Sequence, residues 1–455
     1  MNKRTAALGT EPTHRVLTRL AVPATASLII NATYNIVDSI FVGRFVGTDG
    51  LASVGLNFPL QIFLGAMGIL IGVGASAQIS RRLGAGEIQD ASRAFGSAIS
   101  LILMIGGAIV VLGILLINPV TSALGARGAI LPLAREYFRI IVLGAPLLIA
   151  NQALNNMVYS EGAGAVGFSA LTLSSLMNIA LDWLFIGRLG MGVSGAALAT
   201  VISQATATML LITYFALPKS QLPLRICLCW DDMKETLRVG FSAAIRAITV
   251  VFLALVVNRA AFQVEGDLGI AVASVVFRVV SIVVLPAFGI NQAFLPIVAF
   301  NYGAGRPDRM VRVTWQAILM ALAICFTASI GVAIFSENMA RVFSDDPVFL
   351  SFAARGFRRT FILTPFIIFN LVAAGLYQAV GDARRSMLIS LSRMAFFFIP
   401  LLLVLPRFFG MDGIWSSFPL GEILAATFAT LVALPHVRKL ISQSRLIPRV
   451  AEVPA

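Results

Sequence analysis

Two acidic residues lie inside apolar stretches of the chain, where a charged side chain is expensive to place. Asp38 lies in the apolar run 16–42, and Asp182 lies in another such run with Asn178 one helical turn before it. A carboxylate at the centre of a bilayer costs roughly 2.5–3.5 kcal/mol on insertion scales. Because acids buried in membrane helices commonly carry ions or protons, these two residues predict a site for a coupling cation.

Amide and hydroxyl side chains accompany these acids. Two nearby acids repel each other and lose hydration on burial, so we expect Asp38 and Asp182 to share a proton or a cation. Sodium is the main alternative to a proton, since carboxylate, amide and hydroxyl oxygens suit a hard cation. For the amides and the threonine, hydrogen bonding between helices is the competing interpretation. The predicted cation site, with a possible Na⁺, comprises Asp38, Asn178, Asp182 and Thr200.

The composition predicts that these residues are held by membrane-spanning helices. The 455 residues are 58% hydrophobic and 12% charged, which is too apolar for a soluble domain of this length. The apolar runs are continuous, whereas transmembrane strands would alternate in hydrophobicity. The sequence therefore predicts an all-α membrane protein with twelve spans, near 16–42, 51–80, 92–117, 131–158, 164–186, 193–216, 236–262, 269–300, 311–335, 350–379, 386–406 and 412–435.

The two halves of the chain are related by a repeat. A shift of 219 residues carries Gly84-Ala85-Gly86 onto Gly303-Ala304-Gly305, and Phe138-Arg139 onto Phe357-Arg358. Six helices in each half give both halves the same orientation, related by an axis along the membrane normal. We predict two pseudo-symmetric six-helix lobes with these limits: an N-lobe at 1–217, a linker at 218–235, a C-lobe at 236–437 and a tail at 438–455.

The repeat does not extend to the acids. The same shift places Asp38 on Val257, Asn178 on Phe397 and Asp182 on Leu401. The second lobe instead carries Arg246, Arg278, Arg393 and Glu422 within its spans, and Arg246 could face a substrate cavity, pair with Glu422 or extend to the interface. The predicted cavity residues are Tyr34, Asn35, Gln152, Asn155 and Tyr159 in the first lobe, and Arg246, Asn291, Gln292 and Gln378 in the second.

The distribution of basic residues predicts the orientation. One side of the predicted topology, which includes both ends of the chain, collects 20 lysines and arginines against 11 on the other, so we place both termini in the cytoplasm. The net charge of +13 lacks the clustered basic and aromatic residues of a nucleic-acid surface. Cys227, Cys229 and Cys325 predict neither disulfides nor a zinc site, and residues 1–15 do not form a signal peptide.

The segments YNIVDSIFVGRFVG (34–47), INQAFLPIVAFNYGAG (290–305) and LYQAVGDA (376–383) carry a family resemblance. Over essentially all twelve spans the chain resembles the multidrug and toxic compound extrusion (MATE) family. The resemblance implies an antiporter with a central cavity, in the branch whose cation site uses positions matching Asp38, Asn178, Asp182 and Thr200. Another branch couples through acids in spans seven and ten, which this chain lacks.

These observations lead to one functional prediction and two alternatives. We expect a secondary antiporter of a bacterial cytoplasmic (inner) membrane that exports amphipathic, cationic small molecules in exchange for H⁺ or Na⁺. We expect it to be a monomer in the lipid bilayer, to bind no cofactor or nucleic acid and not to be an enzyme. A lipid-linked precursor flippase of the same superfamily is the first alternative. An intramembrane prenyl transferase, using Asp231-Asp232 or Asp345-Asp346, is the second.

Overall fold

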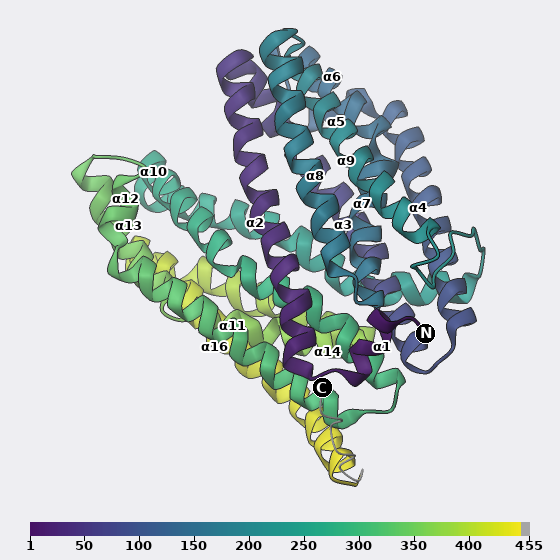
Figure 1. Ribbon diagram of the computed structural model, residues 1–455. Helices are drawn as coiled ribbons and strands as arrows, with labels where there is room; N and C mark the ends of the chain where they lie inside the picture. The colour runs from purple at the N-terminus through teal and green to yellow at the C-terminus, as the bar shows by residue number, and fades with distance from the viewer. Residues whose placement is uncertain (447–455) are drawn as a thin grey trace. The chain divides into compact units, whose positions relative to one another are not determined.

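A computed structural model describes residues 1–446, apart from the side chains of 251, 445 and 446, and contains helices and connecting loops throughout that range (Figure 1). The residues 447–455 of the predicted tail lie outside the described residues. The helices of the first half are α1 (Lys3–Thr10), α2 (Thr13–Phe45), α3 (Thr48–Gly84), α4 (Ile88–Leu115), α5 (Ile117–Ala123), α6 (Ile130–Leu143), α7 (Ala145–Val158), η1 (Tyr159–Glu161), α8 (Gly164–Asp182), η2 (Trp183–Arg188) and α9 (Gly192–Ala216).

The second half is also helical. Its elements are α10 (Trp230–Gly303), α11 (Pro307–Ile334), α12 (Ser336–Arg341), α13 (Pro347–Phe361), η3 (Thr364–Phe366), α14 (Ile367–Val380), α15 (Ala383–Leu391), η4 (Ser392–Phe398) and α16 (Ile399–Leu446). Two of the short segments, η2 and η4, are π-helical. Each lies within the fifth predicted span of its half of the chain.

The predicted number of spans is confirmed. In the described chain, nine helical segments are long and apolar enough to cross a membrane, and the bent pair α6 and α7 makes a tenth. Two of the nine are interrupted: α10 has non-helical backbone at Glu265 and Gly266, and α16 has it at Gly410. Since each interruption separates two spans, residues 1–446 contain twelve. Their ends agree with the predicted ones to within a few residues in most cases, but α16 continues to Leu446, beyond the predicted end at 435.

Two compact units divide the chain. Unit 1 consists of residues 1–10 and 26–244, and unit 2 consists of residues 11–25 and 245–455. The sequence predicts the linker between lobes at 218–235. In the structure, residues 217–229 connect α9 to α10, and residues 230–235 form the first turns of α10, all within unit 1. One boundary between the units therefore lies inside α10, after Ala244, and another lies inside α2, after Thr25.

Hydrogen-bonded turns support the internal repeat. Gly47, Gly86 and Gly162 have positive φ, as do Gly266, Gly305 and Gly381, their counterparts under the shift of 219. Glycine is favoured at these positions because a Cβ atom strains the left-handed backbone. The turn after α3 is closed by a bond from the Glu87 N–H to the Arg82 carbonyl, and the turn after α10 repeats it from Arg306 to Asn301. The two halves thus share their turn geometry as well as their sequence register.

Close backbone contacts hold the first turns of α10 within unit 1. A Cβ atom built at Gly240 would lie 1.7 Å from the Leu70 carbonyl oxygen of α3, and one at Gly74 would lie 2.0 Å from the Thr236 carbonyl oxygen. Small residues permit this approach of two helices. Here glycine is required at both positions, because the atoms that it approaches are backbone.

Replacing Gly240 with alanine should therefore destabilise unit 1. The added methyl group forces α3 and α10 apart, and overpacking of this kind costs roughly 1–3 kcal/mol. A Gly65→Ala variant is the matched control, since a Cβ atom there meets no atom within 4 Å. Thermal unfolding in detergent should show a lower midpoint for Gly240→Ala alone; equal midpoints for both variants would contradict this contact.

A charged cluster fixes the same part of α10 to α3 and α4. Asp232 is buried, and its carboxylate accepts hydrogen bonds from Arg82, Arg93 and Gln78. In the second acidic pair of the sequence, the Asp346 carboxylate accepts from the Val348 N–H and caps α13. Because one acid of each pair has a structural partner, the acidic pairs give no support to the alternative of an intramembrane transferase.

The core of unit 2 is apolar where unit 1 carries its acids. Val257, the counterpart of Asp38, is 1% exposed and belongs to a buried cluster with Phe357, Phe398 and Trp415. At equivalent positions of the repeat, unit 2 thus has the apolar side chain of Val257 and unit 1 has the carboxyl group of Asp38.

Candidate functional site

The two predicted acids come from different helices of unit 1. Asp38 lies near the end of α2, and Asp182 is the last residue of α8, directly before the π-helical η2. The wider turn of a π-helix changes the direction of neighbouring side chains and is frequent at functional sites. Asp182 is fully buried, whereas Asp38 is half-buried, with one carboxylate oxygen, Oδ1, enclosed.

The structure brings the two carboxyl groups together. They interact directly and lie within hydrogen-bonding range of each other. Neither acid has a salt-bridge partner among the described residues. Two facing carboxylates cannot hydrogen bond to each other, because each is only an acceptor. The contact becomes favourable when one of them carries a proton or when a cation lies between them.

Hydrogen-bond donors do not satisfy this cluster. Within residues 1–446, no donor reaches either oxygen of Asp182 or the Oδ1 atom of Asp38, and both polar atoms of the Asn178 amide are buried without a partner. An unsatisfied buried polar group costs about 1–3 kcal/mol, and more when it is charged. The cluster is therefore an arrangement of oxygen acceptors that a positive particle would stabilise.

Two tyrosines lie beside the acids. Tyr34, on the same face of α2 as Asp38, interacts with Asn35 and Gln204 and lies close enough to both acids for an electrostatic interaction. Tyr137 of α6, a buried residue, interacts with Asp38, Tyr34 and Asp182 in the same way. Its hydroxyl accepts a hydrogen bond from the Gln61 amide at 2.7 Å.

Tyr137 was not predicted from the sequence. It lies between Arg135, Glu136 and Arg139, and this run of charge is typical of the end of a span rather than of a buried site. The signal that identifies it is its position one turn from Ile141 and Ala134, which are also buried on α6.

Thr200, the fourth residue of the predicted cation site, is buried on α9. Its carbonyl oxygen accepts a hydrogen bond from the Ser203 hydroxyl at 2.9 Å. Among the described residues, its own hydroxyl donates to neither acid. Groups of three or more histidine, cysteine or acidic side chains, as a tightly bound metal would need, are absent from the described part of the chain. A cation held here would rely on carboxylate, amide and hydroxyl oxygens, which suits Na⁺.

The predicted cavity residues of unit 1 are in different environments. The Asn155 amide donates to the Gly167 carbonyl at 3.1 Å and so links α7 to α8, as the interpretation of a structural amide expects. Tyr159 is buried, Gln152 is half-buried and Asn35 is exposed, with its amide donating to the Asn31 carbonyl at 2.7 Å.

In unit 2, the structure changes one pairing that the sequence suggested. Glu422 pairs with Arg393, whose Nε lies 3.1 Å from Oε2, and so Arg246 is not its partner. Arg246 instead donates to the Ser390 hydroxyl at 3.3 Å. Arg393 and Glu422 lie 29 residues apart on different helices, so sequence spacing carries no signal for their contact.

The remaining predicted residues of unit 2 lie on α10 and α14. Asn291 and Gln378 are buried, and Gln292 is half-buried. A Cβ atom at Gly375 of α14 would lie 2.7 Å from Oδ1 of Asn291, so glycine leaves room for that amide.

The comparison with known protein families agrees with this architecture. The family model MatE matches the chain twice, over residues 23–184 and again over residues 243–404. The chain belongs to the MatE family. The two matches begin 220 residues apart, at 23 and 243, in agreement with the internal repeat.

Relatives and solved structures extend the likeness over the whole chain. This MatE protein is 26% identical to "Multidrug export protein MepA" of Staphylococcus aureus (strain N315), over 96% of its own length and 97% of that protein. Its fold matches "Outward-facing conformation of a multidrug resistance MATE family transporter of the MOP superfamily" with a TM-score of 0.92 and 24% identity, covering 97% and 99% of the two chains. It also matches a MOP superfamily transporter from Pyrococcus furiosus with a TM-score of 0.90 and 24% identity, covering 97% and 99%.

Proposed function

We propose that this MatE protein is a secondary antiporter that exports small amphipathic cations from the cell in exchange for H⁺ or Na⁺. The observation that carries the proposal is the contact between Asp38 and Asp182, two membrane-embedded carboxyl groups whose enclosed oxygens have no donor among the described residues. The relatives named as multidrug export proteins support the export of drugs. We place the protein in the cytoplasmic membrane with both termini inside, as the basic residues predict.

The cycle that we propose couples the acid pair to the packing of α2. Only 22% of the most apolar window of α2 is buried, the lowest fraction among the nine spanning segments of the described chain. A helix with so little buried surface can shift at a small cost in packing. Uptake of H⁺ or Na⁺ removes the repulsion between Asp38 and Asp182, draws α2 toward α8 and favours the release of substrate outward.

The available energy is sufficient. A tenfold gradient of one coupling ion yields about 1.4 kcal/mol, which equals the cost of tenfold accumulation of a substrate, and the exchange of one such ion for one monovalent cation moves no net charge. An acidic site beside the aromatic rings of Tyr34 and Tyr137 also favours cationic substrates, through charge and cation–π attraction.

Transport into proteoliposomes tests the proposal. Wild-type protein should export a cationic dye when a pH or Na⁺ gradient is imposed, and the Asp38→Asn variant should lose that response because its amide cannot take up the coupling ion. Changing one gradient at a time identifies the ion. Equal gradient-driven transport by the variant would refute the role of Asp38, and no response of the wild type to either gradient would refute antiport.

The flippase alternative finds less support in unit 2. It needs a strongly cationic cavity for a pyrophosphate group. The charge of Arg393 is neutralised by Glu422, which leaves Arg246 and Arg278, of the arginines predicted in the spans of unit 2, to supply that charge. Drug susceptibility separates the two functions. Cells that express the protein should tolerate cationic dyes better than cells that express Asp38→Asn, whereas unchanged tolerance to every dye would favour lipid transport.

A further inference from the structure

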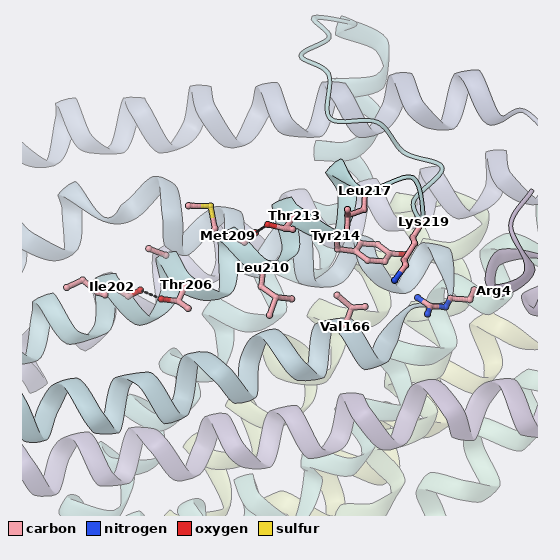
Figure 2. A pocket seen from close by; sticks show the side chains of 11 residues that line it. Arg4, Val166, Ile202, Thr206, Met209, Leu210, Thr213, Tyr214, Leu217 and Lys219 are labelled. Carbon is pink, nitrogen blue, oxygen red and sulfur yellow. Dashed lines mark hydrogen bonds between the residues drawn. The ribbon is translucent and has the colours of Figure 1, made fainter.

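An open groove runs along the surface of unit 1, away from the acid pair. It has a volume of about 690 Å³ and is lined mainly by one face of α9, with Val166 of α8 on its other side (Figure 2). Its α9 residues recur at steps of three and four and are largely apolar: Ile202, Ala205, Thr206, Met209, Leu210 and Thr213. Met209 is 66% exposed, so the groove opens to the surroundings of the protein.

One end of this groove is positively charged. Arg4 of α1 and Lys219, just after α9, are the only charged residues among those that line it, and Figure 2 shows both at the same end. Neither forms a salt bridge with a carboxylate in the described residues. An apolar groove with two cations at one end matches an amphiphile with an anionic head.

Contacts within unit 1 hold these two cations in place. The Asn2 side chain donates to the Lys219 carbonyl at 2.9 Å, and Gln221 donates to the Thr5 hydroxyl at 3.0 Å. These bonds fix α1 to the segment that follows α9. The N-terminal helix therefore carries Arg4 to the groove as part of a built structure.

The acid that interacts with Arg4 is already engaged. Glu161 interacts electrostatically with Arg4, but its carboxylate accepts hydrogen bonds from Tyr214, Ser220 and the Gln221 N–H at 2.7–2.9 Å. Even with the charge of Glu161 counted against Arg4 and Lys219, an excess positive charge remains to attract an anion.

The length of the groove and the predicted side of its charged end both fit a membrane lipid with an anionic head group. From Ile202 to Leu217, α9 rises about 22 Å, more than the roughly 15 Å of hydrocarbon in one leaflet. The charged end lies on the side that we predict to be cytoplasmic, where basic pockets next to membrane helices bind anionic head groups.

We propose that this groove binds an anionic phospholipid of the cytoplasmic leaflet. Its phosphate lies between Arg4 and Lys219, and one acyl chain lies along α9 beside Leu210 and Met209. The site is separate from the proposed antiport site, and none of the predicted cation or cavity residues lines it.

Native mass spectrometry of the purified full-length protein with phosphatidylglycerol or phosphatidylcholine tests this site. Wild type should retain phosphatidylglycerol preferentially, and a combined Arg4→Gln and Lys219→Gln variant should lose about fivefold in affinity for each basic residue removed, since each is worth roughly 1 kcal/mol. The matched control removes two exposed basic residues from the other predicted side, as Arg44→Gln with Arg127→Gln, and should bind like wild type.

Two further arms separate a lipid from other ligands. Met209→Trp, which fills the groove and keeps both cations, should also weaken retention of phosphatidylglycerol. Inorganic phosphate should not compete, because it lacks the acyl chain. Equal retention of the two lipids by wild type, or equal loss in the control variant, would overturn the proposal, and competition by phosphate would show a soluble-anion site instead. Equal melting temperatures would show that the variants fold alike.

Discussion

Replacing both Asp38 and Asp182 with asparagine should impair gradient-driven export no more than replacing either one alone. The two carboxyl groups interact directly, and in the proposed cycle they hold one coupling ion together, so the loss of either partner should remove its site. When one ion is exchanged for one monovalent cation, no net charge crosses the membrane, so a tenfold gradient of the ion supports about tenfold accumulation of substrate, and this accumulation should disappear in all three variants. Residues that act as a unit are strongly non-additive in this way.

Dye accumulation in proteoliposomes at a fixed gradient of the coupling ion measures this effect. Asp49→Asn is the matched control, because Asp49 is exposed in the first turn of α3. It should transport like wild type. Two independent losses that multiply in the double variant would show that Asp38 and Asp182 bind separate ions, and full activity of Asp182→Asn would remove it from the site.

Breaking the ion pair between Arg393 and Glu422 should produce the largest loss of stability. Side-chain exposure is 13% for Arg393 and 4% for Glu422, so Glu422→Gln leaves a guanidinium group uncompensated in an apolar region. Removing one partner of a buried pair costs roughly 3–5 kcal/mol. Replacing both partners, as Arg393→Met with Glu422→Leu, should restore most of the stability, because no unpaired charge remains.

Thermal unfolding of the purified variants measures this difference. The matched control is Glu337→Gln, which breaks the exposed pair between Glu337 and Arg358, at 63% and 54% side-chain exposure. An exposed pair contributes about 0–1 kcal/mol, so the unfolding midpoint of Glu337→Gln should hardly differ from that of the wild type. Equal unfolding midpoints for Glu422→Gln and Glu337→Gln would show that the Arg393–Glu422 pair does not stabilise unit 2.

The fold could be predicted because hydrophobic length and the repeat are local properties of the sequence. Twelve apolar runs and paired glycines at Gly86 and Gly305 are visible without knowledge of tertiary contacts. The interruption of α10 at Gly266 was also expected as the gap between two spans. The short helix α1 was not, because its eight residues lack a strong apolar pattern and it is held by contacts with distant residues such as Lys219.

The candidate site could be predicted only where a residue contrasts with its neighbours. Asp38 and Asp182 stand out because they are charged within apolar runs, whereas Tyr137 is hidden among charged neighbours. The partner of Glu422 depended on which arginine the folded helices bring close, and spacing alone could not distinguish Arg246 from Arg393. Pairing across helices is set by packing, and packing is not a local property.

The contacts that hold the first turns of α10 change the interpretation of the polar segment that precedes this helix. Asp232 and Gly240 bind the opening turns of this helix to the bundle that contains α3 and α4. The helix consequently continues past Ala244, the last residue of unit 1, as far as the interruption at Glu265 and Gly266. The loop before Trp230 can therefore vary in length without loosening these contacts, because Asp232 and Gly240 lie after it within unit 1.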